Sequence, residues 1–463
     1  MEKIKVGYLP FYIKLYDDSD PSGRDPMVEH MHKMIAMLEA EGLEIILADE
    51  VCRIREEFDR AVDKFNRLGV TAVITQHLAY SPSLESIDAL LRLKADIIVL
   101  DTTVDYNLLT DGSKINAMPN HGIHGVQDMC CMLKRNGRNY YLCAGHIQQG
   151  KLIGELVGLC RAAAAAKAFR EARVGSVGGS FTGMGDFMIS DQDYAEKIGA
   201  NVIYMQPEEI KSLLAQITDT EIDEEIAANQ QRYTVEVSRI DNYREASRSG
   251  LALRKWVEAN KLTACTVNFL TLDEYELPKM PFVECCKLME RGLGYAGEGD
   301  VLTAGLTGAL MQVYPNTGFT EMFCPDWERD LLLLSHMGES NPNLAAWKPL
   351  VTDCPFNYNS CGDTVAMYTF MKAGKAVIVN LVPTDGRYQL LLCPVELPES
   401  ALNPNVGRKS NQGWFKSSMP LADFLKAYSL AGGTHHCAIV YDVDITELET
   451  FGKMMNFDVT VIG

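Results

Sequence analysis

The stretch TAVITQHLAYSPSLESIDALLRLKADIIVLD, residues 71–101, decides the fold class of this chain. Two short runs of apolar residues, 71–75 and 96–101, flank a segment around 84–93 whose apolar residues recur at helical spacing. A strand, a helix and a second strand in that order form the repeating unit of a parallel sheet covered by helices. Because neither strand alternates polar with apolar residues, both faces of the sheet should be buried.

The same alternation extends in both directions from this unit. Met27, Met31, Met34, Ile35 and Leu38 recur at helical spacing, and we interpret this stripe as core packing rather than as a flexible binding surface. The sequence therefore predicts an N-terminal α/β domain over residues 1–172. Its expected elements are strands at 5–9, 43–48 and 139–145 and helices at about 25–38, 54–68 and 151–172.

Two further domains are expected, because 463 residues are too many for one compact core. A central α/β domain, 173–322, should contain strands at 173–179, 201–206 and 265–270 and a long polar helix at about 223–260. A C-terminal β-rich domain, 323–463, follows. Its apolar segments 376–382 and 388–397 lie between turn-rich stretches, which predicts an antiparallel sheet or small barrel. The last expected elements are helices at 421–430 and 445–455 and strands at 435–442 and 458–462.

Composition narrows the possible partners. A net charge of −19 argues against nucleic acid and anionic membrane surfaces and suits a small neutral substrate. The longest apolar helical stretch, 152–166, contains Glu155 and Arg161 and is not expected to span a membrane. No secretory start is expected at the N-terminus. The 13 cysteines include no C-x-x-C pair, so we expect reduced, buried thiols in a cytoplasmic protein.

The spacing Gly292, Gly294, Gly297 matches the G-x-G-x-x-G pattern of a dinucleotide loop. That pattern must follow a strand, yet the preceding residues read as a helix. We therefore expect these glycines to end a helix and to shape the loop that presents Glu298. Asp300 should cap the next helix, 301–313.

Four side chains in the C-terminal half suggest chemistry: Glu298 in GYAGEGD, Glu321 in GFTEMF, His336 in LLLLSHMGE and His436 in AGGTHHCAI. Taken singly, each has an ordinary structural explanation as a surface carboxylate or a hydrogen-bonded core histidine. Burying an unpaired carboxylate among phenylalanines, or a histidine after four leucines, is costly, and a shared metal ion would satisfy both. Carboxylate and imidazole ligands without thiolate favour Mn²⁺, with Co²⁺, Fe²⁺ or Mg²⁺ as substitutes and zinc less favoured. The two carboxylates could also act as an acid–base pair.

These motifs, in this order, resemble those of the L-arabinose isomerase family, which is related to the L-fucose isomerases. The matching segments are GEGD (297–300), F-x-E (319–321), SHM-x-E (335–339), AGG-x-HH (431–436), AGH-x-Q (144–148) and GMGDF (183–187). The resemblance implies a three-domain subunit in a homotrimer or homohexamer with the active site at a subunit boundary. It also implies Mn²⁺ held by Glu298, Glu321, His336 and His436, the last preferred to His435, with both glutamates as catalytic groups.

The resemblance further implies that His124, in GIHG, contacts the sugar across the subunit boundary and that Met184 lines the sugar pocket. The substrate loop departs from the family, whose Gly-Ser-Gln and Leu-Tyr-Gly residues are replaced here by LPFYIKLYDD (9–18). His121 also stands where a glutamine is usual. Phe11, Tyr12 and His121 are therefore further candidate substrate-binding residues, and the identity of the sugar stays open.

The resulting hypothesis is an Mn²⁺-dependent aldose–ketose isomerase acting on a pentose, hexose or modified sugar through an ene-diol intermediate. Glu298 is expected to act as base and Glu321 as its partner, although the reverse order and a direct hydride shift both stay open. The alternatives are a metal-dependent sugar epimerase on the same scaffold and a non-catalytic sugar-binding relative. A NAD-dependent oxidoreductase ranks third.

Overall fold

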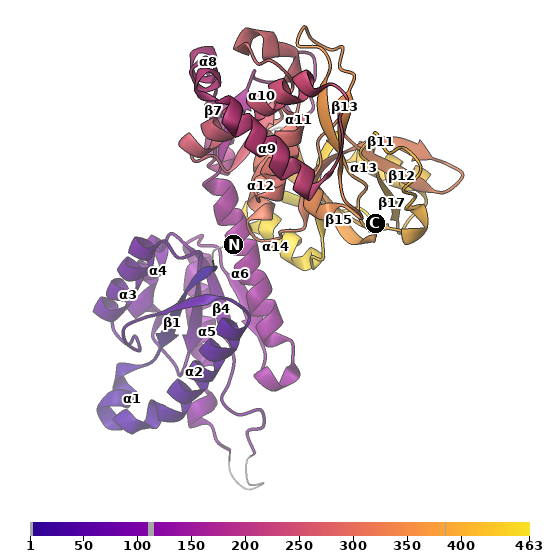
Figure 1. Ribbon diagram of the computed structural model, residues 1–463. Coiled ribbons are helices and arrows are strands. Elements are labelled where there is room, and N and C mark those ends of the chain that lie inside the picture. Colours follow the sequence, from indigo (N-terminus) through magenta and orange to yellow (C-terminus); the bar gives the residue numbers. More distant parts are fainter. Residues whose placement is uncertain (1–2, 110–114, 385) are drawn as a thin grey trace. The chain divides into compact units, whose positions relative to one another are not determined.

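The structure is a computed structural model that describes residues 3–109, 115–384 and 386–463. The chain divides into two compact units, residues 1–164 and 165–463 (Figure 1). Throughout the described ranges, every helix is too short or too polar to cross a bilayer.

The first unit is built on a five-stranded parallel sheet in the order β2-β1-β3-β4-β5. Its strands are β1 (Lys5–Phe11), β2 (Glu44–Leu47), β3 (Ala72–His77), β4 (Asp96–Asp101) and β5 (Tyr141–Ala144). The helices of this part of the chain are α1 (Lys14–Ser19), α2 (Asp25–Ala40), α3 (Arg55–Leu68), α4 (Ser83–Arg92), α5 (Ile123–Arg135) and α6 (Leu152–Arg170). The strand order reverses direction between β1 and β3, and in open α/β sheets ligands bind beyond the carboxyl ends of the strands at such a point.

Packing in this unit follows the predicted pattern. The methionine stripe of α2 is buried, which confirms its role in the core. Phe58 and Phe65 of α3, Leu90 of α4 and Leu133 of α5 are buried together with Val73 of β3 in one apolar cluster. The apolar strands therefore lie where their uninterrupted hydrophobic sequence predicts, with helices packed against them.

The second unit contains a four-stranded parallel sheet in the order β10-β9-β6-β7. Its strands are β6 (Arg173–Val177), β7 (Asn201–Tyr204), β9 (Ala264–Val267) and β10 (Gly294–Gly297). Its main helices are α8 (Pro207–Gln216), α9 (Asp219–Arg232), α10 (Ile240–Ala259), α11 (Phe282–Glu290) and α12 (Val301–Met311), and α12 is buried along its whole length.

The prediction of a single polar helix at about 223–260 is wrong. The chain there forms α9, then the short strand β8 (Thr234–Glu236), then α10. β8 pairs in parallel with β13 (Leu350–Cys354), which pairs with β14 (Thr364–Tyr368) in a three-stranded sheet. The break arises because residues 234–236 bond to a strand more than a hundred residues away, a contact that local helical spacing does not report.

The C-terminal part forms a closed six-stranded antiparallel barrel, which confirms the predicted barrel-like architecture of this part of an α/β protein. The ring runs β15-β18-β11-β12-β17-β16 and closes through a β15–β16 pairing, and a short strand adds to β16 in parallel. The barrel strands are β11 (Thr317–Asp326), β12 (Leu331–Ser335), β15 (Gly374–Thr384), β16 (Arg387–Leu397), β17 (Gly413–Ser417) and β18 (His436–Tyr441), and the added strand is β19 (Asp458–Val461). Helices α13 (Leu421–Leu430) and α14 (Ile445–Met454) complete this part.

Candidate metal centre

Glu298 projects from a sharp turn between β10 and α12. Both Glu298 (φ 63°) and Gly299 (φ 78°) adopt the left-handed backbone region, which is uncommon for a residue with a side chain. The Glu298 amide donates to the carbonyl of Val267 (3.1 Å), and its carbonyl accepts from the amide of Phe181 (3.1 Å). The backbone is thus held in a costly conformation at the carboxyl end of the parallel sheet, as is frequent at functional sites.

The prediction for the glycine pattern is confirmed only in part. Gly292 (φ 85°) follows the end of α11 as expected, and the pattern does not form a loop between a strand and a helix. The expected loop over the remaining glycines is wrong, because residues 294–297 form strand β10 and the turn begins only at Glu298. Asp300 caps α12, and its Oδ1 accepts from the Thr303 amide at 2.8 Å.

The barrel brings Glu321 and His436 together by strand register. Glu321 on β11 lies opposite Ser335 of β12 on one side and opposite His436 of β18 on the other. His336 follows Ser335 directly. Three candidate residues that are far apart in the sequence therefore lie side by side at one end of the barrel.

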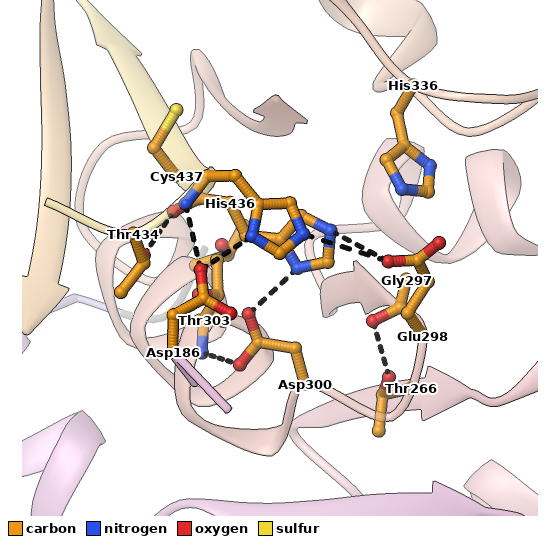
Figure 2. A network of polar contacts seen from close by, with 12 residues as sticks. Asp186, Thr266, Gly297, Glu298, Asp300, Thr303, His336, Thr434, His436 and Cys437 are labelled. Atoms are coloured by element: carbon orange, nitrogen blue, oxygen red, sulfur yellow. Dashed lines mark hydrogen bonds and ion pairs between the residues drawn. The ribbon is translucent and has the colours of Figure 1, made fainter. Parts of the chain in front are cut away.

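His436 is fully buried, and its two ring nitrogens face different carboxylates (Figure 2). Nδ1 lies 3.0 Å from Asp300 Oδ2, and Nε2 lies 3.5 Å from Glu298 Oε2. The ring stacks on Phe187 with centroids 5.1 Å apart. Among the described residues, Nε2 has no hydrogen-bond partner. A buried imidazole whose Nδ1 is held by a carboxylate presents Nε2 as a free ligand, which is the usual arrangement at metal sites.

His336 is held in a similar way. It is 8 % exposed, and its Nδ1 lies 2.5 Å from Glu339 Oε2, although the contact is poorly aligned for a hydrogen bond. Glu339 Oε1 accepts from the hydroxyl of buried Tyr295. The ring packs over Gly297, where a Cβ atom would lie 2.6 Å from His336 Cε1 and 3.0 Å from Nε2. Only glycine at 297 leaves room for the ring in this position.

His435, like its neighbour His436, faces Glu298. Its Nδ1 lies 2.6 Å from Asp186 Oδ2, and its Nε2 lies 3.9 Å from Glu298 Oε2. One ligand atom from each of Glu298, His435 and His436 can be chosen so that all lie within 4.8 Å of one another. This triad is a candidate metal site in which both adjacent histidines take part.

The surroundings of the two glutamates shift their pKa values in opposite directions. Burial would raise the pKa of Glu298, but His435 and His436 outweigh it and hold that pKa well below its usual range. Burial raises the pKa of Glu321, and His336 opposes the shift only in part. Burial would lower the pKa of His436, yet Asp300 and Glu298 raise it to about 9. The centre thus concentrates positive charge around Glu298 and leaves Glu321 less readily ionised.

A cavity of about 610 Å³ opens beside these residues. Glu298, Glu321, His336, His435 and Met184 all line it, so the structure brings these candidate residues together around one space. The rest of the wall contains both aromatic and polar side chains. The aromatic ones are Phe269, Phe282, Phe323, Phe356, Tyr358 and Tyr368, and the polar ones are Ser335, Glu339, Lys409, Ser410 and Asn411.

The other candidate residues lie in the first unit. Phe11 is fully buried and stacks on His77, with ring centroids 4.5 Å apart, so it belongs to the core of that unit. Tyr12 is 1 % exposed. His121 and His124 are neighbours, with centroids 5.2 Å apart, and their rings contact Tyr16 and Tyr80 respectively. Both histidines lie between β4 and β5 in the sequence, His121 just before α5 and His124 within its first turn.

Three carboxylate contacts were not identified from the sequence: Asp186 on His435, Glu339 on His336, and Asp300 on His436. Asp300 was predicted only as a helix cap. A signal was present, because Asp186 lies in GMGDF, Glu339 in SHM-x-E and Asp300 in GEGD. The motifs did not show which histidine each carboxylate would meet.

The residues of the site fit a divalent cation. Nε2 of buried His436 has no hydrogen-bond partner among the described residues and lies 3.5 Å from Glu298 Oε2, so a cation that displaces the proton of this nitrogen would find a ligand there. Imidazole nitrogens oriented by carboxylates, together with carboxylate oxygens, are ligands for Mn²⁺, Fe²⁺, Co²⁺ or Zn²⁺.

Comparison with known families agrees with this arrangement. Residues 188–316 match the central domain of L-arabinose isomerase, and residues 316–458 match its C-terminal domain, so that together the matches cover more than half of the chain. The chain belongs to the L-arabinose isomerase family.

Individual members of the L-arabinose isomerase family are distant. The L-arabinose isomerase of Clostridium beijerinckii is 26 % identical over 411 residues, which cover 87 % of this chain and 83 % of that protein. The L-arabinose isomerase of Aeromonas salmonicida is 25 % identical over 459 residues, which cover 94 % and 90 %. The similarity therefore extends over almost the whole length of both proteins, while three residues in four differ.

Proposed function

We propose that this protein is a metal-dependent aldose–ketose isomerase that acts on a pentose, hexose or modified sugar through an ene-diol intermediate. The observation that carries the proposal is the gathering of Glu298, Glu321 and His336 around one cavity in a chain of the L-arabinose isomerase family. Two carboxylates in different environments beside a cation site are the groups that sugar isomerisation requires.

Glu298, Glu321, His336 and His436 would hold the ion, with Mn²⁺ favoured and Co²⁺, Fe²⁺ or Mg²⁺ as substitutes. When bound, the ion supplies Lewis-acid stabilisation of negative charge on the sugar oxygens. Asp300 and Glu339 orient the two histidine rings from outside the ligand set. His435 is the third member of the triad described above, but unlike His436 it lines the cavity, so we propose that it contacts the sugar rather than the ion.

The two glutamates divide the proton transfers. Glu298 is ionised and lines the cavity, so we propose it as the base that takes the proton from the carbon next to the carbonyl, with the reverse assignment to Glu321 as the alternative. The electron pair of that C–H bond forms the carbon–carbon double bond of the ene-diol, and the carbonyl oxygen would gain a proton from Glu321, whose raised pKa suits a proton carrier. Glu321 would then take the proton of the adjacent hydroxyl. Glu298 would return its proton to the former carbonyl carbon, which completes the isomerisation.

A direct hydride shift is distinguishable from this route. With substrate deuterated at the transferred position, the ene-diol route exchanges label with solvent water, whereas complete internal retention would contradict it. Product NMR read in the same experiment separates an isomerase from an epimerase, because an epimerase leaves the carbonyl in place.

We also propose that His121 and His124 contact the sugar from the N-terminal part of another subunit in a homotrimer or homohexamer. Phe11 and Tyr12 then act by shaping that part, since both are buried. We propose that the chain has three domains, with boundaries at residues 172 and 322.

We also propose a cytoplasmic location. Most of the free cysteines within the described ranges are buried, which suits a reducing compartment.

The test is a screen of aldoses and ketoses after removal of metal with a chelator. We expect turnover to vanish on chelation and to return with Mn²⁺, and more weakly with Co²⁺ or Mg²⁺. Sugar binding without turnover under every metal would instead identify a non-catalytic relative.

The shared site has its own test. Co-expressed Glu298→Gln and His124→Ala chains, each inactive or impaired alone, should regain part of the activity in mixed oligomers, since some sites then combine two intact halves. Absence of any recovery in mixed oligomers of verified composition would contradict a site shared between subunits.

A further inference from the structure

We propose that Asp186 is a positioning residue that holds His435 on the sugar side of Glu298, an inference that rests on the proposed function. Asp186 follows β6 in the α/β part, and His435 immediately precedes β18 of the barrel, 249 residues later. A single oxygen, Asp186 Oδ2, lies 2.6 Å from His435 Nδ1 and accepts from the His435 backbone amide at 3.1 Å. The ring and the backbone of His435 are therefore fixed by the same carboxylate.

This contact determines where the other ring nitrogen lies. His435 Nε2 lies 3.9 Å from Glu298 Oε2, the same oxygen that His436 Nε2 approaches at 3.5 Å. The two imidazoles converge on one carboxylate oxygen, and their centroids are 4.3 Å apart. A rotation of His435 would therefore change the surroundings of the proposed base directly.

Burial separates the roles of the two histidines. His436 is fully buried, and its carboxylate partner Asp300 is fully buried as well. The side chain of His435 is 32 % exposed and that of Asp186 is 38 % exposed, and His435 lines the cavity. Asp300 thus supports a ligand of the ion, whereas Asp186 supports the histidine that faces the sugar.

Phe187, the residue after Asp186, also helps to position the two histidines. Phe187 is 1 % exposed and stacks flat on His436, with an interplanar angle of 6°. Adjacent residues of one segment therefore contact both histidines, Asp186 through a carboxylate and Phe187 through its ring. The segment sets the spacing between the ion ligand and the sugar-facing histidine.

A double-mutant cycle tests whether Asp186 acts through His435. The variants are Asp186→Ala, His435→Gln and the double variant, with Asp191→Ala as a matched control because that nearby carboxylate accepts from Tyr204 instead. We expect each single variant to lower kcat by about 10- to 100-fold through misplacement of reacting groups, with Asp191→Ala near wild type. The double variant should be no worse than His435→Gln, because groups that act as a unit are not additive. Additive losses would overturn the proposal.

Metal affinity separates the positioning role from support of the ion. Titration of Mn²⁺ followed by electron paramagnetic resonance should give Asp186→Ala a Kd within about threefold of wild type. Asp300→Ala should bind about 10- to 100-fold more weakly, as loss of a carboxylate behind a ligand histidine usually does. Equal weakening in both variants would show that Asp186 serves the ion and would overturn the proposal.

A third measurement does not depend on turnover. In crystal structures of wild type and Asp186→Ala, we expect the His435 ring to leave its position near Glu298 while His436 stays in place. An unmoved His435 ring in the variant would overturn the inference. A wild-type protein that turns over no sugar would reject the proposed function, yet the ring orientation would still decide the role of Asp186.

Discussion

At the scale of single residues, Glu298 and Glu321 carry the same carboxylate in different surroundings. Burial would raise the pKa of both, but only Glu298 has two imidazole nitrogens within 4 Å of one oxygen, and its pKa falls. Glu321 keeps a raised pKa. Two groups whose environments separate their pKa values can serve as base and proton carrier at one pH.

Replacement of Glu321 tests this division of labour. Glu321→Gln should lower kcat/KM by about 10²- to 10⁴-fold, because the amide cannot carry the proton between oxygens. The fold should survive, since the substitution keeps the size of the side chain on β11. Steady-state kinetics with saturating Mn²⁺ measures the loss, and circular dichroism checks the fold. A variant with nearly full activity would remove Glu321 from the mechanism.

Gly297 matters because the His336 ring occupies the space of a side chain. Gly297→Ala should displace His336 and weaken Mn²⁺ binding by about 10-fold or more, since misoriented ligands usually cost that much. Calorimetric titration with Mn²⁺ measures the effect.

Gly154→Ala is the matched control for this substitution. Gly154 lies in α6, where a Cβ atom would meet nothing within 4 Å. We expect unchanged metal affinity and a stability gain of up to about 1 kcal/mol from helix propensity. Equal metal affinity in both variants would show that the ring position does not matter.

At the scale of secondary-structure elements, Asp300 joins a helix to the candidate metal centre. One carboxylate oxygen caps α12 through Thr303, and the other holds His436 Nδ1. Asp300→Asn keeps a capping oxygen but loses the charge behind the histidine. We expect little loss of helix stability and a drop of about 10- to 100-fold in Mn²⁺ affinity. Thermal unfolding without metal and Mn²⁺ titration measure the two effects separately.

The cap of another helix provides the comparison. Asp444 caps α14 through the Thr446 amide at 2.9 Å. Asp444→Ala should cost about 1 kcal/mol of stability and leave Mn²⁺ affinity unchanged. If Asp300→Asn behaved in the same way as this variant, its contact with His436 would have no role in metal binding.

Elements also show how far sequence reasoning reaches. Strands with continuous apolar sequence, such as 71–75 and 96–101, and the cap at Asp300 follow from local chemistry and are confirmed. The interruption of the predicted helix at about 223–260 by β8 does not follow from local chemistry, because β8 forms by pairing with a distant strand. The pairing of Asp186 with His435 likewise needs the barrel to be folded against the parallel sheet, and no local pattern encodes that contact.

At the scale of the whole molecule, a buried histidine in the first unit should make stability depend on pH. Burial is the largest cause that lowers the pKa of His77 to about 3, with Asp128 opposing the shift and His124 adding to it. In the unfolded chain the pKa is about 6.5, so below that pH the unfolded state binds a proton that the folded state does not. The free energy of unfolding should therefore fall as pH drops from about 6.5 toward 3, approaching ~1.4 kcal/mol per pH unit.

Urea unfolding at pH 7.0, 5.5 and 4.5 measures this slope. His77→Gln removes the titrating group and should flatten the dependence on pH relative to wild type. His32→Gln, on an exposed position of α2, is the control and should keep the wild-type slope. Identical slopes in all three proteins would show that folding does not lower the pKa of His77.

The turn before β18 has a consequence for how this chain can tolerate length changes. Gly433 lies against Tyr428, where a Cβ atom would sit 2.2 Å from the ring, and the Tyr428 hydroxyl donates to the Thr434 carbonyl at 2.7 Å. These contacts fix which of the two consecutive imidazoles, His435 or His436, enters the interior. Neighbouring residues of a strand face opposite ways, so inserting or deleting one amino acid in this turn would exchange the two histidines. A change of two residues would keep the same histidine inside.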